Sequence, residues 1–89
     1  MDKGVIVKVY GRVQGVGFRF YTQKRALELN LNGFVRNKPN GSVYIEAEGN
    51  AKDVDEFIDW CQQGPEWARV NKLEKQYSDP VGHDGFLIK

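Results

Sequence analysis

The sequence predicts an α+β fold in which an antiparallel sheet carries two helices on one of its faces. Three patterns lead to this prediction. Residues 4–10 place Val5, Val7 and Val9 on one side of an alternating segment, which is typical of a strand. Residues 54–61 have apolar side chains at positions i, i+3, i+4 and i+7, which is typical of a helix with one buried face. The dipeptide Asn40–Gly41 between two strand-like segments indicates a hairpin.

The first half of the chain is expected to contain a strand, a loop and a helix. After the strand at 4–10, residues 11–17 contain three glycines and therefore predict a loop. Residues 20–30 favour a helix, and we expect Asn32–Gly33 to end it because both residues tolerate a left-handed cap. Periodicity does not decide which of two stripes of this helix is buried. The two stripes are Thr22, Ala26 and Leu29, and Phe20, Leu27 and Leu31.

The second half is expected to contain a hairpin, a second helix and two further strands. Segments 34–38 and 42–48 flank the turn, and Val43, Ile45 and Ala47 are expected to point inward. Asn50 is a candidate N-cap, with Asp53 completing a partial capping box, and Gly64–Pro65 ends the helix. Segment 68–77 is strand-like, and its broken alternation near Leu73 predicts a bulge. Residues 86–88 form a short final strand.

The element order β-α-β-β-α-β, followed by a small extra strand, is the split βαβ or ferredoxin-like arrangement. With 89 residues, the chain has room for one core, so we expect residues 1–89 to form a single domain. This fold supports enzymes, RNA-binding proteins and regulatory modules. The function must therefore be sought in particular residues.

Composition excludes several classes of protein and site. A net charge of +1 does not fit the strong overall basicity of many nucleic-acid-binding proteins. No apolar stretch approaches the roughly 18 residues of a membrane span, and the first residues lack a secretory signal. One cysteine and one histidine exclude a disulfide and a thiolate zinc cluster. We expect a cytoplasmic monomer that needs no metal and no cofactor.

The distribution of charge is uneven along the chain. Residues 1–41 hold eight basic and two acidic side chains, whereas residues 42–89 hold five basic and ten acidic ones. A basic first half suggests an anionic ligand, although solvated surface lysines would produce the same count.

The segment Gly11–Arg19 is the most informative part of the sequence. Glycines between a strand and a helix allow backbone N–H groups to turn toward one point, and the helix adds its positive N-terminal end. Arg19 adds a fork of donors that suits phosphate. The glycine spacing matches neither a P-loop nor a dinucleotide-binding fingerprint. From these residues alone, an anion site and a tight turn with a surface ion pair at Arg19 remain equally open.

The segment Gly33–Asn37 carries a second candidate. In the expected sheet, the second strand runs near the start of the first helix, so Asn37 would lie beside the glycine-rich loop. Its amide can both accept a hydrogen bond from a water molecule and donate one to it. The alternative is that Asn37 and Asn40 only shape the hairpin.

Together these motifs resemble those of the acylphosphatase family. The resemblance rests on Gly-Arg-Val-Gln-Gly-Val-Gly-Phe-Arg at 11–19, Gly-Phe-Val-Arg-Asn at 33–37 and Gly-Ser-Val at 41–43. It extends over essentially the whole chain, including Gly64–Pro65 and the Ala-Arg-Val at 68–70. It implies a small cytosolic, metal-independent hydrolase that converts an acyl phosphate into a carboxylate and inorganic phosphate.

The resemblance also implies roles for individual residues. The family's essential arginine and asparagine fall on Arg19 and Asn37. Asn37 would orient the attacking water, and Arg19 would bind the phosphoryl group together with backbone amides of the loop. The residues that would supply these amides are Gln14, Gly15, Val16, Gly17, Phe18 and Arg19.

Two other functions compete with hydrolysis. An RNA-recognition motif has the same element order, but segment 42–48 supplies only Tyr44 beside two glutamates, which repel phosphate. A regulatory module would bind an anion at the loop without turnover, and such a binder would not need Asn37. Elsewhere, we expect His83 to be a surface residue, Cys61 to be a buried inert thiol, and Trp60 and Trp67 to serve in packing.

Overall fold

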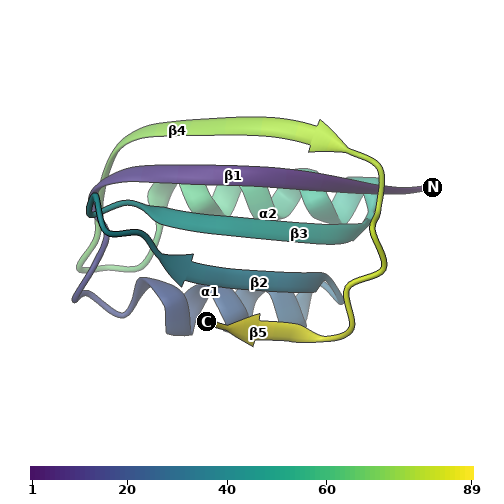
Figure 1. The fold of residues 1–89 in the computed structure, drawn as a ribbon, viewed down its shortest axis with the longest axis horizontal. Coiled ribbons are helices and arrows are strands. Elements are labelled where there is room, and N and C mark those ends of the chain that lie inside the picture. The colour runs from purple at the N-terminus through teal and green to yellow at the C-terminus, as the bar shows by residue number, and fades with distance from the viewer.

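Five strands and two helices make up the computed structural model, which describes residues 1–89 (Figure 1). The strands lie in the order β4-β1-β3-β2-β5. The four longer strands pair antiparallel with one another, which confirms the ferredoxin-like prediction. The sheet was expected to be antiparallel, and the short β5 departs from this by pairing with β2 in parallel. The elements are β1 (Asp2–Arg12), α1 (Phe18–Glu28), β2 (Asn32–Asn37), β3 (Val43–Asn50), α2 (Ala51–Gln63), β4 (Arg69–Ser78) and β5 (Phe86–Ile88).

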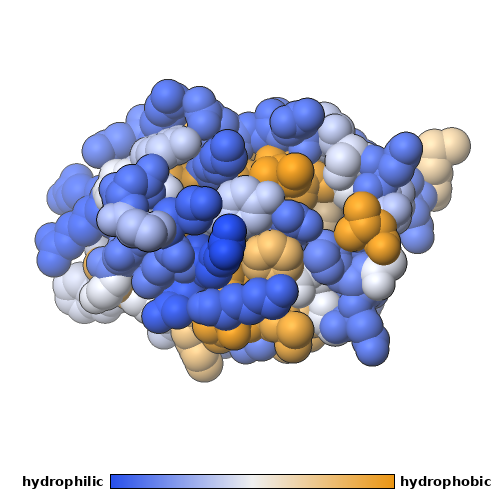
Figure 2. All heavy atoms as spheres, in the orientation of Figure 1, coloured by the Kyte–Doolittle hydropathy of each residue, from blue (hydrophilic) through white to orange (hydrophobic).

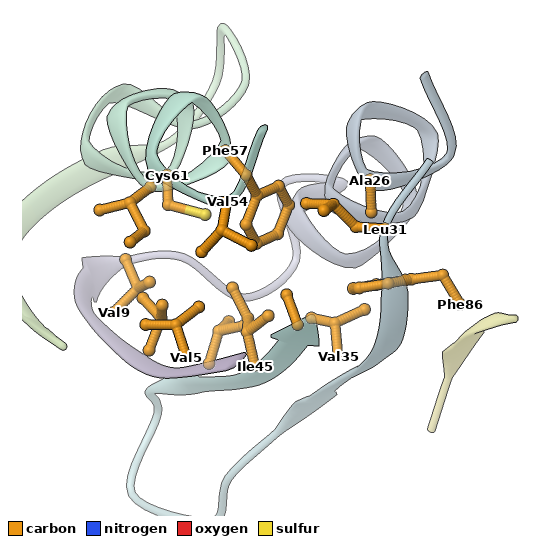
Figure 3. Close-up of a cluster of buried hydrophobic side chains, with 14 of the residues drawn as sticks. Val5, Val9, Ala26, Leu31, Val35, Ile45, Val54, Phe57, Cys61 and Phe86 are labelled. Carbon is orange, nitrogen blue, oxygen red and sulfur yellow. The ribbon is translucent and has the colours of Figure 1, made fainter. Parts of the chain in front are cut away.

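Both helices cover one face of the sheet, and the core lies between the two layers (Figures 1 and 3). The core is one cluster of 17 buried apolar residues. The predicted inward positions of β1 and β3 and the predicted apolar face of α2 all belong to it. Each fully buried Val, Ile or Phe side chain contributes about 1.5–3 kcal/mol by leaving water, so this cluster stabilises the two-layer arrangement. Neither helix is long and apolar enough to cross a membrane.

Helix α1 buries the stripe that contains Thr22 and Ala26, together with Leu29, which follows the helix. On the other stripe, Phe20 and Leu27 are 59% and 55% exposed. Leu31 is buried because it lies beyond the helix, in the connection to β2.

The expected end of α1 at Asn32–Gly33 is wrong, since the helix ends at Glu28 and both residues belong to β2. The chain reverses at Asn30, the one non-glycine residue with a positive φ, 57°. Asn tolerates this left-handed conformation better than most residues. Gly33 is needed for close pairing instead, because a Cβ atom there would lie 1.9 Å from the backbone oxygen of Glu46.

Helix α2 begins and ends where the sequence predicts. The Asn50 side chain accepts a hydrogen bond from the backbone N–H of Lys52 at 3.0 Å, and Gly64 stops the helix. The bulge in β4 lies at Asn71, two residues before the expected position. Tyr10 pairs with Lys72 and Gly11 with Val70, so Asn71 is the extra residue.

The topology brings the ends of β1 and β2 to one edge of the molecule. Both strands flank β3, and both end at the side of the sheet where α1 begins, on the left in Figure 1. Residues 13–17 connect β1 to α1 at this edge. Their two ends are fixed by Val13 and Phe18, which are both buried in the core. The predicted glycine-rich loop is therefore short and firmly anchored.

We predict that Thr22→Val stabilises the protein. The Oγ1 atom of Thr22 is buried and has no hydrogen-bond partner. A buried polar group without a partner lowers the free energy of unfolding by about 1–3 kcal/mol. Val has the shape of Thr without the hydroxyl group and a similar helix propensity. The free energy of unfolding in urea should rise by about 1 kcal/mol. Thr22→Ala, which leaves a cavity, should lower it. A decrease with Val would contradict the assignment.

Candidate active site

The loop between β1 and α1 offers a group of free backbone donors. The N–H groups of residues 14–20 donate to no acceptor in the protein, and the first helical bond runs from the Tyr21 N–H to the Gly17 oxygen at 3.1 Å. Gly15 and Gly17 have φ values of 73° and 79°, which favour glycine. The N-terminal end of α1 adds its positive dipole. The loop therefore has the chemistry of an anion site.

A cleft of about 240 Å³ opens beside this loop. It brings together most of the residues that the sequence singles out, including Arg19 and Asn37. The exception is Val16, whose side chain packs against the core and does not line the cleft. The lining residues are Val13, Gln14, Gly15, Gly17, Phe18, Arg19, Phe20, Asn37 and Ile88.

Asn37, the last residue of β2, lines the cleft and has an unused acceptor. Its Oδ1 atom is buried and has no hydrogen-bond partner in the protein. Buried amide oxygens are nearly always paired, so an unpaired one at a cleft suits a ligand or water that donates to it. The alternative that Asn37 only shapes the hairpin does not explain this atom, because the turn is held by Asn40 instead.

Arg19 lies in the first turn of α1 with most of its donors free. Its Nη1 donates to the backbone oxygen of Lys89 at 3.4 Å, which is its one hydrogen bond within the protein. It forms no ion pair with an Asp or Glu side chain, so the surface ion pair considered from the sequence is not formed. The guanidinium charge is therefore available to an anion in the cleft.

Comparison with known proteins decides the family. The family model described as acylphosphatase matches residues 5–88 of this chain. The chain belongs to the acylphosphatase family. An acylphosphatase of Mannheimia succiniciproducens is 57% identical over 67 residues, which cover 75% of this chain and 74% of the relative.

Solved structures of acylphosphatases have the same fold. The crystal structure of the Bacillus subtilis acylphosphatase has a TM-score of 0.92 at 36% identity. The match covers 100% of this chain and 99% of the Bacillus subtilis chain. The acylphosphatase structure from Coxiella burnetii has a TM-score of 0.95 at 31% identity. The match covers 99% of this chain and 93% of the Coxiella burnetii chain. As a member of this family, the chain is an enzyme that hydrolyses acyl phosphates.

The side chain of Gln14 braces the cleft through contacts that the sequence did not predict. Its Nε2 donates to the backbone oxygens of Lys38 and Ser42 at 2.8 and 2.9 Å. These residues close the hairpin turn that follows Asn37, with the Lys38 N–H donating to the Ser42 oxygen at 2.8 Å. Gln14 therefore ties the loop to the strand end that carries Asn37. The sequence did offer one signal of this role, since Gln14 is the only polar side chain in a glycine-rich, otherwise apolar loop at residues 13–17.

Other candidate residues lie away from the cleft. Cys61 is buried in the core, where burial raises the pKa of its thiol, as expected for an inert cysteine. His83 is not simply a surface residue, because its Nε2 lies 3.1 Å from Glu46 Oε1 and its ring contacts Phe34. Trp60 packs against the core as predicted, whereas Trp67 is 72% exposed. No three His, Cys, Asp or Glu side chains gather into a metal-binding group.

We predict that Gln14→Glu loosens the acylphosphatase site. A carboxylate cannot donate to the Lys38 and Ser42 oxygens and would repel both. The free energy of unfolding should fall by about 1–3 kcal/mol, and the rate of acyl phosphate hydrolysis should fall with it. Gln62→Glu makes the same change at an exposed position of α2 and serves as the control. Equal behaviour of the two variants would contradict the bracing role.

Proposed function

We propose that Arg19, the loop amides and Asn37 together carry the hydrolysis of acyl phosphates in this cleft. The observation that supports this most strongly is the convergence of a free guanidinium, unpaired backbone donors and an unpaired amide oxygen on one space. Arg19 and the N–H groups of residues 14–19 hold the phosphoryl oxygens and neutralise their charge. Preorganised donors of this kind stabilise the transition state because they need no rearrangement during the reaction.

Asn37 has a different role in the proposal. Its Oδ1 accepts a hydrogen bond from a water molecule and directs the water oxygen toward phosphorus, opposite the carboxylate that leaves. The new bond joins the water oxygen to phosphorus, while the bond between phosphorus and the carboxyl oxygen breaks and its electron pair leaves with the carboxylate. The products are a carboxylate and inorganic phosphate.

The mechanism needs no basic side chain. Arg19 is the only ionisable residue that lines the cleft, and a guanidinium donates hydrogen bonds but accepts none. A phosphoryl oxygen of the substrate takes the proton from the water. This is sufficient because phosphoryl transfer depends chiefly on position and charge stabilisation, and a carboxylate is a good leaving group.

We propose that residues 1–89 act as one metal-independent, cytoplasmic monomer, with no cofactor and no nucleic-acid or membrane partner. The single core cluster supports one domain.

The RNA-binding alternative is disfavoured by the face of the sheet opposite the helices. That face is largely hydrophilic (Figure 2). Its aromatic pair, Phe34 and Tyr44, stack on each other at 5.9 Å, with Lys89 over the ring of Phe34 and Lys38 and Arg36 near that of Tyr44. Both rings are only partly exposed, and the Glu46 carboxylate, which accepts a hydrogen bond from the Tyr44 hydroxyl at 2.7 Å, would repel a phosphate there. A non-catalytic anion binder would leave the unpaired oxygen of Asn37 without a use.

We predict that Arg19→Ala and Asn37→Ala each lower kcat/KM for an aryl acyl phosphate by at least about 10²–10³, in the presence of a chelator. Release of inorganic phosphate measures the rate. Arg36→Ala is the matched control, because Arg36 adjoins Asn37 but lies near the Tyr44 ring on the opposite face of the sheet. The proposal fails if folded Arg19 or Asn37 variants turn over normally, and loss of wild-type activity in chelator would overturn metal independence.

A further inference from the structure

Two exposed apolar side chains stand at the same cleft. Phe20 and Ile88 both line it, although they are 59% and 41% exposed to solvent. Single exposed apolar residues are common and need no explanation. Here, however, the two come from different elements, the first turn of α1 and the end of β5.

Both side chains are close to the charge that would hold the phosphoryl group. Phe20 directly follows Arg19 in the helix. Ile88 directly precedes Lys89, whose backbone oxygen accepts the Arg19 hydrogen bond at 3.4 Å. Arg19, Phe20 and Ile88 line the same cleft, so a phosphoryl group bound at Arg19 would have its substituent in the space that these two side chains border.

The positions of both residues are fixed by the fold. Ile88 pairs with Val35 in the parallel ladder, and the Lys89 N–H donates to the Val35 oxygen at 2.8 Å. Gln23, one turn after Phe20, donates from Nε2 to the Phe86 oxygen at 2.8 Å and so ties α1 to β5. The ring of Tyr21 meets the ring of Phe20 edge to face at 5.1 Å. These contacts therefore hold Phe20 and Ile88 in fixed positions at the cleft.

The cleft has room for more than a phosphoryl group. Its volume of about 240 Å³ equals that of roughly eight water molecules, whereas a phosphate has five heavy atoms. Beyond Arg19, none of the lining residues carries a charge, so a second carboxylate on the substrate would find no further cation there.

We propose that Phe20 and Ile88 form an acyl-group subsite that favours acyl phosphates with an uncharged, apolar acyl group, aromatic acyl groups above all. This inference rests on the proposed function, because it presumes that the phosphoryl group is bound at Arg19. The acyl group lies against the Phe20 ring and the Ile88 side chain, which are then shielded from water. Such contacts are equal in the ground state and the transition state, so they lower KM and leave kcat unchanged.

The test compares benzoyl phosphate, acetyl phosphate and the carboxylate-bearing succinyl phosphate in steady-state hydrolysis. The wild type should have the highest kcat/KM for benzoyl phosphate. In Phe20→Ala and Ile88→Ala, the KM for benzoyl phosphate should rise about tenfold, with kcat and the kinetics of acetyl phosphate within about twofold of the wild type. Leu27→Ala removes an equally exposed apolar side chain from α1, two turns away from the cleft, and should change nothing.

A binding experiment separates the subsite from the catalytic proposal. Benzylphosphonate and methylphosphonate are titrated into the protein, and Phe20→Ala should weaken only the benzyl compound, about tenfold. Equal losses for both phosphonates, or unchanged affinity for both, would overturn the subsite while wild-type turnover still supports the proposed function. A wild type that binds both phosphonates equally and hydrolyses none of the acyl phosphates would overturn both.

Discussion

The register of β3 with its two neighbours is the constraint on which the site depends. Val43 is paired with Val9 of β1 on one side and with Asn37 of β2 on the other. This pairing aligns the end of β2 with the last buried residue of β1, three residues before that strand ends at Arg12. Because side chains alternate between faces, a slip of one residue would turn Asn37 to the opposite face of the sheet. The register is held by the core, where Val35, Val43 and Ile45 are all buried.

Most of the fold is predictable because its local patterns agree with its packing. The alternation in β1, the apolar face of α2 and the Asn50 cap are each patterns within a short stretch of sequence. Three features depend on distant residues and were missed or misplaced. Asn32 and Gly33 pair with β3 and so do not end the helix, the bulge at Asn71 depends on register with Gly11, and the direction of β5 depends on its pairing with β2.

The same distinction applies to the site. Arg19 and Asn37 were found through motifs, and the structure places both at the cleft with the loop. The bracing contacts of Gln14 join residues 24 and 28 positions apart, so no local pattern reveals them. The proposed subsite of Phe20 and Ile88 also depends on the tie between α1 and β5. Residue type therefore predicts an anion site, whereas the side chains around the cleft are identified only in the tertiary structure.

Polar groups without a partner in the protein meet at the cleft. Two cations of the basic first half pair with acidic residues of the second, Lys3 with Asp55 at 2.9 Å and Arg25 with Glu56 at 2.8 Å. Arg19 has no such partner, and Asn37 Oδ1 is one of only two buried side-chain atoms left without a hydrogen bond. The other is Thr22 Oγ1, which lies in the packed face of α1. An unsatisfied group costs stability wherever it lies. Of these two residues only Asn37 lines the cleft, so only there would a bound molecule recover an interaction that folding leaves unmade.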